Sequence, residues 1–138
     1  MKIITNNEKK TFTFAKKFAK TLKGGEVIGL IGDLGTGKTI FAKGLAAGLG
    51  VKQPINSPTF VLMKVYKANR KNIKKLVHID AYRLKKPQDI LAIGFYDYLK
   101  KDDTVVIVEW ADKIKRSLPN KTKCVQFYHL GEKRKIIY

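Results

Sequence analysis

Apolar residues recur with two different periods along this chain, and the two periods predict helices and strands in alternation. Over residues 14–22, two phenylalanines, two alanines and a leucine recur at the three- and four-residue spacing of a helix face. Val27–Ile31 is instead a continuous apolar run, typical of a strand that is covered on both faces of a sheet. A second helix is predicted over residues 39–49 and ends at Gly50.

The start of the first helix has a signal of its own. Thr5 followed by Glu8 fits a capping box, in which two side chains and two backbone N–H groups pair reciprocally. The sequence therefore predicts that the first helix opens at Thr5. Gly24–Gly25 is predicted to end it.

Further strands are predicted in the rest of the chain. The pattern indicates strands at residues 60–63, at 75–80 and, most strongly, in the apolar run 104–109. Residues 125–138 predict a hairpin that turns at Gly131–Glu132.

Shorter helical segments are predicted between these strands. Residues 88–100 have helical spacing that is interrupted at Gly94, and residues 112–118 predict a short basic helix. Apolar strands that alternate with helices indicate an α/β fold with a mixed, mostly parallel central sheet flanked by helices. The C-terminal hairpin is expected to add antiparallel strands.

The length of the chain predicts its domain organisation, and its charge predicts the classes of partner it could contact. The chain has 138 residues, 44% of them hydrophobic, which predicts one domain over residues 1–138 with a core of its own. Its 29 Lys and Arg residues outweigh 11 Asp and Glu residues, for a formal net charge of +18. This charge favours contact with RNA, DNA or an acidic protein. Because the lysines form no repeated motif, an evenly basic, solvated surface is the alternative interpretation.

Cysteine usage and hydropathy bear on the compartment. Cys124 is the single cysteine, so no disulfide can form within the chain and a reducing compartment is expected. Met1–Lys10 lacks the apolar core of a signal peptide, and no apolar run reaches the roughly 18 residues that span a bilayer. We therefore expect a cytoplasmic protein that contacts no membrane.

One motif predicts the central chemistry. Gly32–Thr39 matches the phosphate-binding pattern G-x-x-x-x-G-K-T and lies between a predicted apolar strand and a predicted helix. Gly35 and Gly37 would let the backbone turn its N–H groups toward phosphate oxygens, which the N-terminus of the helix also favours. Lys38 would reach the β- and γ-phosphates, and the Thr39 hydroxyl would join the Mg²⁺ shell. The motif predicts a P-loop NTPase that binds and hydrolyses ATP with Mg²⁺.

In so basic a chain, the acids that close apolar strands are informative. Asp80 and Glu109 each follow such a strand, and open α/β sheets bind their ligands at the carboxyl ends of strands. A P-loop enzyme needs a carboxylate there for the metal and its water. Glu109 is the first candidate for this role, and Asp80 is the second metal-side carboxylate or a group that positions water. A solvated strand-end acid or a local salt bridge is the alternative for each.

Two further residues have more than one interpretation. Trp110 either packs in the core, which the sequence alone favours, or contacts a partner or the nucleotide. His78 alternates with the apolar residues Val77 and Ile79, so it is interpreted as a packed or surface histidine rather than a catalytic one. Two histidines and one cysteine predict no zinc cluster.

Four blocks of the chain together resemble the TsaE family, the small ATPase of bacterial tRNA threonylcarbamoylation. The blocks are Gly32–Thr39, Ser57–Phe60, His78–Leu84 and Glu109–Trp110, and their order and spacing agree with the family. The stretch Ile93–Leu99 is also similar, so the resemblance extends over nearly the whole chain. The first block is shared with many NTPases, whereas the other three are far more specific.

The resemblance implies a catalytic group of side chains. Thr59 would lie in a switch-like loop that senses the γ-phosphate, and Asp80 would lie near the metal and the attacking water. Glu109 would be the acid of the metal site, together with Thr39. Lys38 would act on the phosphates.

The resemblance also implies a nucleotide-binding group. Its members on the phosphate loop and just beyond are Gly35, Thr36, Gly37, Lys38, Thr39 and Ile40. Trp110 would lie beside the nucleotide, against the core packing that the sequence alone favours. Thr11 would lie near the adenine, and Arg134 would be a late basic residue near the nucleotide. Ile40 stands where the family often has a second hydroxyl, so we expect no extra phosphate contact there.

The implied function is that of an ATPase subunit required for threonylcarbamoyladenosine in tRNA, next to the anticodon. The subunit would act on a complex of the TsaB and TsaD proteins and would not itself transfer the threonylcarbamoyl group. We expect weak ATPase activity in isolation, because no arginine is fixed in the phosphate loop. The substrate of the complex would be tRNA, and contact of tRNA with the basic surface is left open.

Two other functions fit parts of the sequence. A small-molecule P-loop kinase would share the phosphate loop, but it needs an acceptor pocket and an arginine-rich lid, and the four arginines here are scattered. A nucleic-acid-binding module regulated by a nucleotide would explain the charge. Base-stacking aromatics, however, are not clustered with the lysines.

Overall fold

The strands of this protein form one twisted sheet, seen in a computed structural model that describes residues 1–56 and 62–138. The strands are β1 (Lys2–Thr5), β2 (Val27–Ile31), β3 (Met63–Arg70), β4 (Ile73–Asp80), β5 (Thr104–Glu109), β6 (Lys123–Leu130) and β7 (Lys133–Ile137). Within the described residues their order is β1-β7-β6-β2-β5-β4-β3. The central strands β6, β2, β5 and β4 are parallel, whereas β3, β7 and β1 join by antiparallel pairing. The predicted mixed, mostly parallel sheet and the C-terminal hairpin are confirmed.

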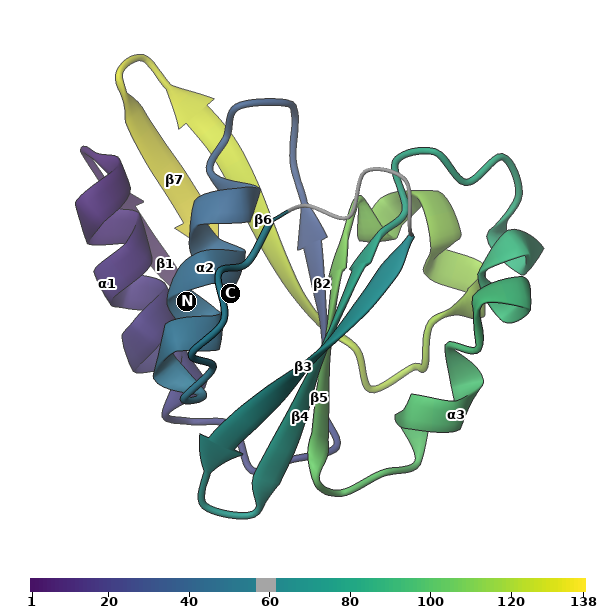
Figure 1. The fold of residues 1–138 in the computed structure, drawn as a ribbon. Coiled ribbons are helices and arrows are strands. Elements are labelled where there is room, and N and C mark those ends of the chain that lie inside the picture. Colours follow the sequence, from purple (N-terminus) through teal and green to yellow (C-terminus); the bar gives the residue numbers. More distant parts are fainter. Residues whose placement is uncertain (57–61) are drawn as a thin grey trace.

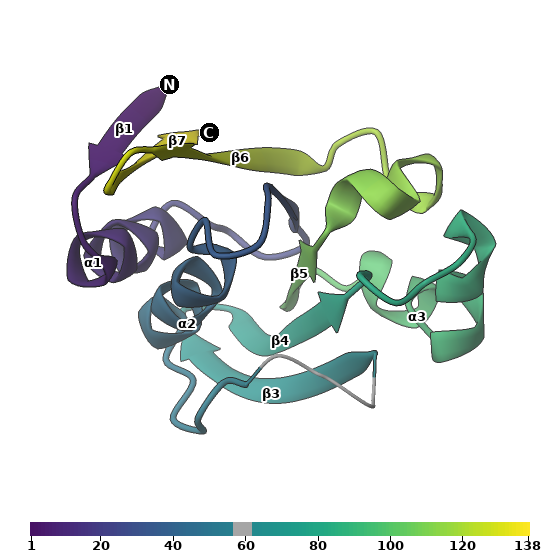
Figure 2. The same cartoon turned by 90° about the horizontal axis from the view of Figure 1, so that it is seen from above.

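Helices cover both faces of the sheet (Figure 1). Helices α1 (Glu8–Ala19) and α2 (Lys38–Gly48) pack together on one face. The 3-10 segments η1 (Pro87–Ile93) and η2 (Ala111–Ser117), with the short helix α3 (Tyr96–Leu99), cover the other. Figure 2 shows these two groups on opposite sides of the twisted strands. Within the described residues, no helix is both long and apolar enough to cross a bilayer.

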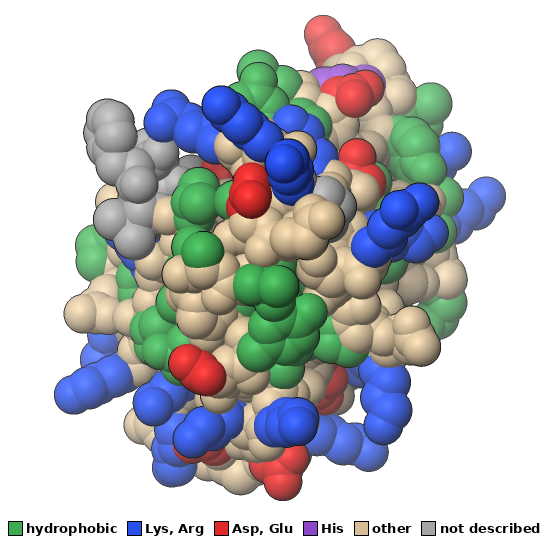
Figure 3. Space-filling view, turned by 90° about the vertical axis from the view of Figure 1, so that its right-hand side faces the viewer, with side chains coloured by type: hydrophobic (Ala, Val, Ile, Leu, Met, Phe, Trp, Pro, Cys, Tyr) green, Lys and Arg blue, Asp and Glu red, His purple; other side chains and the backbone are tan. Residues whose placement is uncertain are grey.

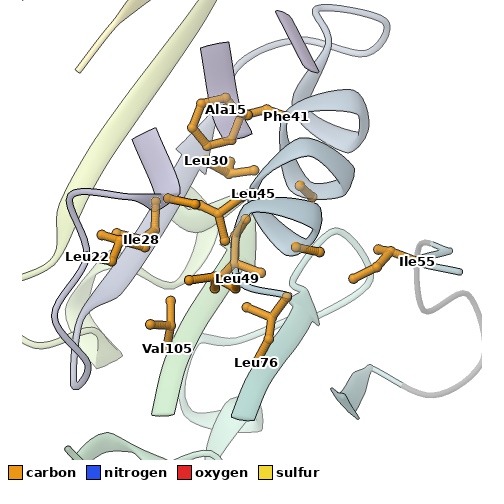
Figure 4. Close-up of a cluster of buried hydrophobic side chains, with 14 of the residues drawn as sticks. Ala15, Leu22, Ile28, Leu30, Phe41, Leu45, Leu49, Ile55, Leu76 and Val105 are labelled. Carbon is orange, nitrogen blue, oxygen red and sulfur yellow. The ribbon is translucent and has the colours of Figure 1, made fainter. Parts of the chain in front are cut away.

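The central strands alternate their side chains between two cores. In β5, Val105 and Ile107 join the cluster under α1 and α2, whereas Val106 and Val108 join the cluster under η1 and η2. The first cluster, drawn in Figure 4, includes Leu45 of α2 beside the strand residues. Burial on both faces is therefore the reason that β2 and β5 are continuous apolar runs.

The N-terminus differs from the prediction. The first helix is capped by Asn7, whose side-chain Oδ1 accepts a hydrogen bond from the Lys10 N–H at 2.8 Å. The capping box at Thr5 was wrong because Thr5 pairs with Arg134 across β1 and β7 and so continues a strand. Strand β1 itself was not predicted, since four residues at a sheet edge offer too short a pattern.

The strand predicted at residues 60–63 falls largely outside the described residues, and β3 begins at Met63. The segments predicted as helical at 88–100 and 112–118 form 3-10 turns and one short α-helix. Gly94, in a left-handed conformation with φ of 78°, ends η1 and separates it from α3. These segments connect the carboxyl ends of β4 and β5 to the rest of the chain, and those ends carry the site.

Candidate functional site

The phosphate loop connects the carboxyl end of β2 to the start of α2, at the top of the molecule in Figure 1. Gly32 approaches the neighbouring strand β6 so closely that a Cβ there would lie 2.7 Å from the Phe127 carbonyl oxygen. Gly37 caps α2 with a φ of 101°, a left-handed conformation that side chains rarely adopt. Both glycines are therefore required by the backbone path that the loop takes.

The phosphate-loop lysine is held against the loop itself. The Lys38 Nζ donates hydrogen bonds to the carbonyl oxygens of Gly32 and Asp33. It also lies 4.2 Å from the centre of the Trp110 ring, within the range of a cation–π contact. Burial lowers the pKa of the Lys38 ammonium, and nearby carboxylates, Glu109 foremost, oppose this shift. The Lys38 Nζ is thus positioned at the loop by two carbonyl oxygens and the Trp110 ring.

The acidic side of the site is built by strand pairing. Asp80 and Glu109 are register partners at the ends of the parallel strands β4 and β5. The Thr39 hydroxyl donates to the Glu109 Oε1 at 3.1 Å, which connects the phosphate loop to β5. Residues 39, 80 and 109, which lie far apart in the sequence, are thereby brought to one place.

The sequence predicted a packed or surface histidine at position 78, and the packed alternative holds, but sequence reasoning missed its contact with Glu109. This residue is fully buried, and its Nε2 lies 2.7 Å from the Glu109 Oε2. Alternation along β4 was the available signal, because it puts His78 and Asp80 on the same face. The apolar residues Val77 and Ile79 lie in the core of the opposite face.

Asp80 is less buried than Glu109. Its Oδ1 accepts a hydrogen bond from the Tyr82 N–H at 2.9 Å. Burial raises the pKa of the Asp80 carboxyl, the bond from Tyr82 opposes the rise, and the neighbouring Glu109 adds to it. Asp80 is therefore a carboxylate that holds a proton more readily than an exposed one.

Trp110 forms one wall of the site together with Tyr82. Their ring centres are 5.0 Å apart, and Lys113 reaches over Tyr82 and donates to its backbone carbonyl at 2.8 Å. Trp110 has a left-handed φ of 58°, which turns the chain at the end of β5. Trp110 packs partly against the second core and also lines the cavity, so both of its sequence interpretations have a structural counterpart.

A cavity of about 270 Å³ opens between the phosphate loop and the acidic side. The predicted residues that line it are Gly35, Gly37, Lys38, Thr39, Ile40, Asp80, Glu109, Trp110 and Arg134. Glu8, Leu34 and Tyr82 also line it; Leu34 belongs to the phosphate-loop block and Tyr82 to the His78–Leu84 block, whereas no site role was predicted for Glu8. Most of the predicted site residues therefore share one cavity, although their individual roles stay predictions.

The remaining predicted residues lie elsewhere. Thr36 is buried in the loop, where its hydroxyl donates to the Asp33 carbonyl at 2.7 Å. Thr11 is fully buried, with its hydroxyl 2.7 Å from that of Thr5, so it supports the loop from behind rather than lining the cavity. Thr59 lies outside the described residues.

Arg134 comes from the C-terminal hairpin and lies over Gly37, with its side chain about 3 Å from where a Cβ on that glycine would lie. Among the described residues its buried Nε has no hydrogen-bond partner. A buried donor without a partner is costly, so an acceptor on a ligand would stabilise this side chain. Arg134 is thus available to bind an anionic group beside the helix N-terminus.

The oxygen donors fit Mg²⁺ better than they fit a tightly caged metal. Thr39 and Glu109 present a hydroxyl and a carboxylate that already contact each other, and Asp80 lies across from Glu109. Within residues 1–56 and 62–138, no group of three or more His, Cys, Asp or Glu side chains gathers to hold a metal by itself. Mg²⁺ takes one or two protein oxygens and completes its shell with phosphates and water, so Thr39 and Glu109 are the residues that could hold it.

Comparison with known proteins gives a consistent result. A family model described as Threonylcarbamoyl adenosine biosynthesis protein TsaE matches residues 5–136. The tRNA threonylcarbamoyladenosine biosynthesis protein TsaE of Rickettsia typhi is 40% identical over 114 residues, which cover 82% of this chain and 76% of that protein. The protein of the same name from Bacillus subtilis is 37% identical over 128 residues, 93% of this chain and 77% of that one.

A solved structure is similar along the whole chain. The crystal structure of YdiB from Bacillus subtilis aligns with a TM-score of 0.80 at 34% sequence identity. The alignment covers 99% of this chain and 82% of that chain. The fold described here is therefore one that a similar protein also adopts.

Proposed function

We propose, from the premise that this chain belongs to the TsaE family of threonylcarbamoyl adenosine biosynthesis proteins, that it binds and hydrolyses ATP in that pathway. The chain would be the Mg²⁺-dependent ATPase subunit and would not transfer the threonylcarbamoyl group itself. The observation that carries the proposal is the Thr39–Glu109 hydrogen bond, which joins the phosphate loop to the acidic strand end across one cavity. A phosphate loop alone would support binding; the two sides together support hydrolysis.

The chain's own groups divide the work of phosphoryl transfer. The loop N–H groups and the start of α2 would bind the phosphates, and Lys38 would exchange its loop carbonyl partners for phosphate oxygens. Thr39 and Glu109 would hold Mg²⁺, which would neutralise charge on the β- and γ-phosphates. Asp80 would orient the water that attacks the γ-phosphorus in line, as the bond to the β-phosphate oxygen breaks.

The proposed partners follow from the family. We propose that the chain acts on a complex of TsaB and TsaD proteins, and that tRNA is the substrate of the whole assembly. Lys and Arg side chains occupy the upper and lower parts of the face in Figure 3, with hydrophobic side chains between them. Because these basic side chains are not gathered in a single groove on that face, we assign any tRNA contact of this chain to general electrostatic attraction. A cytoplasmic location would agree with its single cysteine.

One experiment tests the proposal. ATP turnover by the purified chain is measured with and without the TsaB and TsaD proteins, in Mg²⁺ and in EDTA. We expect slow, Mg²⁺-dependent turnover in isolation and faster turnover with the partners. A rate that the partners leave unchanged would contradict the proposed regulation, and phosphorylation of a nucleoside or sugar by the pure chain would favour a kinase instead.

A further inference from the structure

His78 is the most deeply buried titratable side chain in contact with the site, and the proposed chemistry leaves it without a role. It is 0% exposed and does not line the cavity. It therefore cannot touch the nucleotide directly. The hydrogen-bonded path from His78 to the site runs through Glu109, whose carboxylate it contacts.

The contact has a defined direction. The His78 Nε2 lies 2.7 Å from the Glu109 Oε2, and a carboxylate can only accept, so the imidazole Nε2–H donates. The His78 Nδ1 is buried and has no hydrogen-bond partner among the described residues. A proton there would be a buried donor without an acceptor, which is costly. The contact requires only that Nε2 carry a hydrogen, which it donates to Glu109.

The same carboxylate is held from a second element. Its other oxygen, Oε1, accepts the hydrogen bond of the Thr39 hydroxyl at 3.1 Å. Glu109 is thus held between a donor on β4 and a donor at the start of α2. Two donors on opposite oxygens fix the rotation of the carboxylate plane, which a single donor would leave free.

We propose that His78 is a positioning residue for Glu109: its Nε2–H fixes the orientation in which this carboxylate meets Mg²⁺ bound beside Thr39. The inference rests on the proposed Mg²⁺–ATP site. Hydrogen-bonded neighbours of ligating carboxylates typically change metal affinity by about 10–100-fold when they are removed. The role needs a donor at the position of Nε2, and it needs no change in the charge of the ring.

A pair of amide substitutions isolates this donor. His78→Gln carries an amide nitrogen four bonds from Cα, as far along the side chain as the histidine Nε2. His78→Asn carries the same amide one bond closer, at the distance of Nδ1, where it cannot reach Glu109. Binding of a non-hydrolysable ATP analogue is measured by calorimetry in Mg²⁺ and in EDTA. The ratio of the two affinities reports the Mg²⁺ site separately from the phosphate loop.

We expect His78→Asn to lower that ratio by about tenfold, while binding in EDTA changes less than about threefold, and His78→Gln to retain most of the ratio. Equal losses in Mg²⁺ and EDTA would overturn the inference in favour of general disruption. Equal losses in the Gln and Asn variants, with both folded by circular dichroism, would also overturn it. So would an unchanged ratio in His78→Asn.

A double-mutant cycle adds a second test. If His78 acts through Glu109, His78→Asn has little further effect on the Mg²⁺ ratio in a Glu109→Gln background. Full additivity of the two substitutions would contradict the inference. Analogue binding by the wild-type chain separates this test from the proposed function. If Mg²⁺ does not improve binding by the wild-type chain, the proposed Mg²⁺ site is wrong. If Mg²⁺ improves binding equally in the wild type and in His78→Asn, only the positioning role of His78 is wrong.

Discussion

The two sides of the cavity are built in different ways. The phosphate side, Gly32–Thr39, is a run of consecutive residues that connects β2 to the start of α2. The acid side consists of Asp80 and Glu109, with His78 buried behind Glu109, and these side chains meet only because β4 and β5 pair in one register. Local backbone geometry thus makes one side, and long-range packing makes the other. Phosphate binding and hydrolysis should therefore be separable by substitution.

Removal of the Lys38 side chain on the phosphate side should have the largest effect. Lys38→Ala removes the buried ammonium that would pair with phosphate oxygens, so we expect affinity for an ATP analogue to fall by about 100-fold or more. Titration calorimetry measures it. Lys113→Ala is the matched control, since that lysine also lies near Trp110 but outside the loop, and its loss should cost far less. Equal effects of the two substitutions would mean that net charge, not the loop, binds the phosphates.

A substitution on the acid side should lower ATP turnover and leave nucleotide binding in EDTA nearly unchanged. Glu109→Gln keeps the size of the side chain but removes the negative charge, so we expect ATP turnover to fall by about 100-fold while analogue binding in EDTA stays within about threefold. Steady-state phosphate release measures the turnover, and calorimetry measures the affinity for the analogue. Unchanged turnover would mean that Asp80, not Glu109, holds the metal, and it would contradict the division of binding and hydrolysis between the two sides.

The phosphate side also makes long-range contacts, and the close approach of Gly32 to β6 offers a way to test the comparison. A Cβ at Gly32 would lie 2.7 Å from the Phe127 carbonyl oxygen of β6, so Gly32→Ala should lower the free energy of unfolding by about 1–3 kcal/mol. Urea denaturation measures the loss. Gly131→Asn is the control, because nothing lies within 4 Å of a Cβ there and Asn tolerates its left-handed φ. If Gly32→Ala is as stable as this control, the loop does not depend on β6.

The smallest effect is expected from the charge of Asp80. Burial raises the pKa of its carboxyl, so the folded chain binds this proton more tightly than the unfolded chain does. Stability is therefore lost as the pH rises from the usual Asp pKa through the raised one. Asp80→Asn, which keeps an acceptor for the Tyr82 N–H, should be slightly more stable than the wild type at about pH 7. The difference should vanish by about pH 3 in urea denaturation, and a difference that persists there would refute an electrostatic cause.

The different construction of the two sides also decides what the sequence can predict. Gly32–Thr39 was predictable because its geometry follows from neighbouring residues: a strand, two glycines and a helix start. Asp80 and Glu109 were predictable as strand-end acids, but the contact of His78 with Glu109 depends on the register of β4 against β5, which no local pattern contains. The cavity-lining position of Trp110 agrees with the family resemblance, and its packing against the second core agrees with the strand pattern.

The errors have the same cause. Thr5 matched a local capping signal, and pairing with β7, almost the full chain length away, overrode it. The segments at 88–100 and 112–118 have helical spacing, yet most of their residues form 3-10 turns. Propensity decides an element only where tertiary contacts do not. The fold class was predictable because burial on both faces marks the central strands directly.

The position of β2 has a consequence for how the chain is made. Its two neighbours in the sheet, β5 and β6, begin at residues 104 and 123 and so leave the ribosome long after Val27–Ile31. Until then this apolar segment has no parallel partner, and pairing across such distances is slow. The loop that follows it is therefore assembled late in synthesis, although it is encoded early. A nascent chain arrested before Lys123 should lack an ATP site, and Val27–Ile31 would at that stage be an unpaired apolar segment of the kind that chaperones bind.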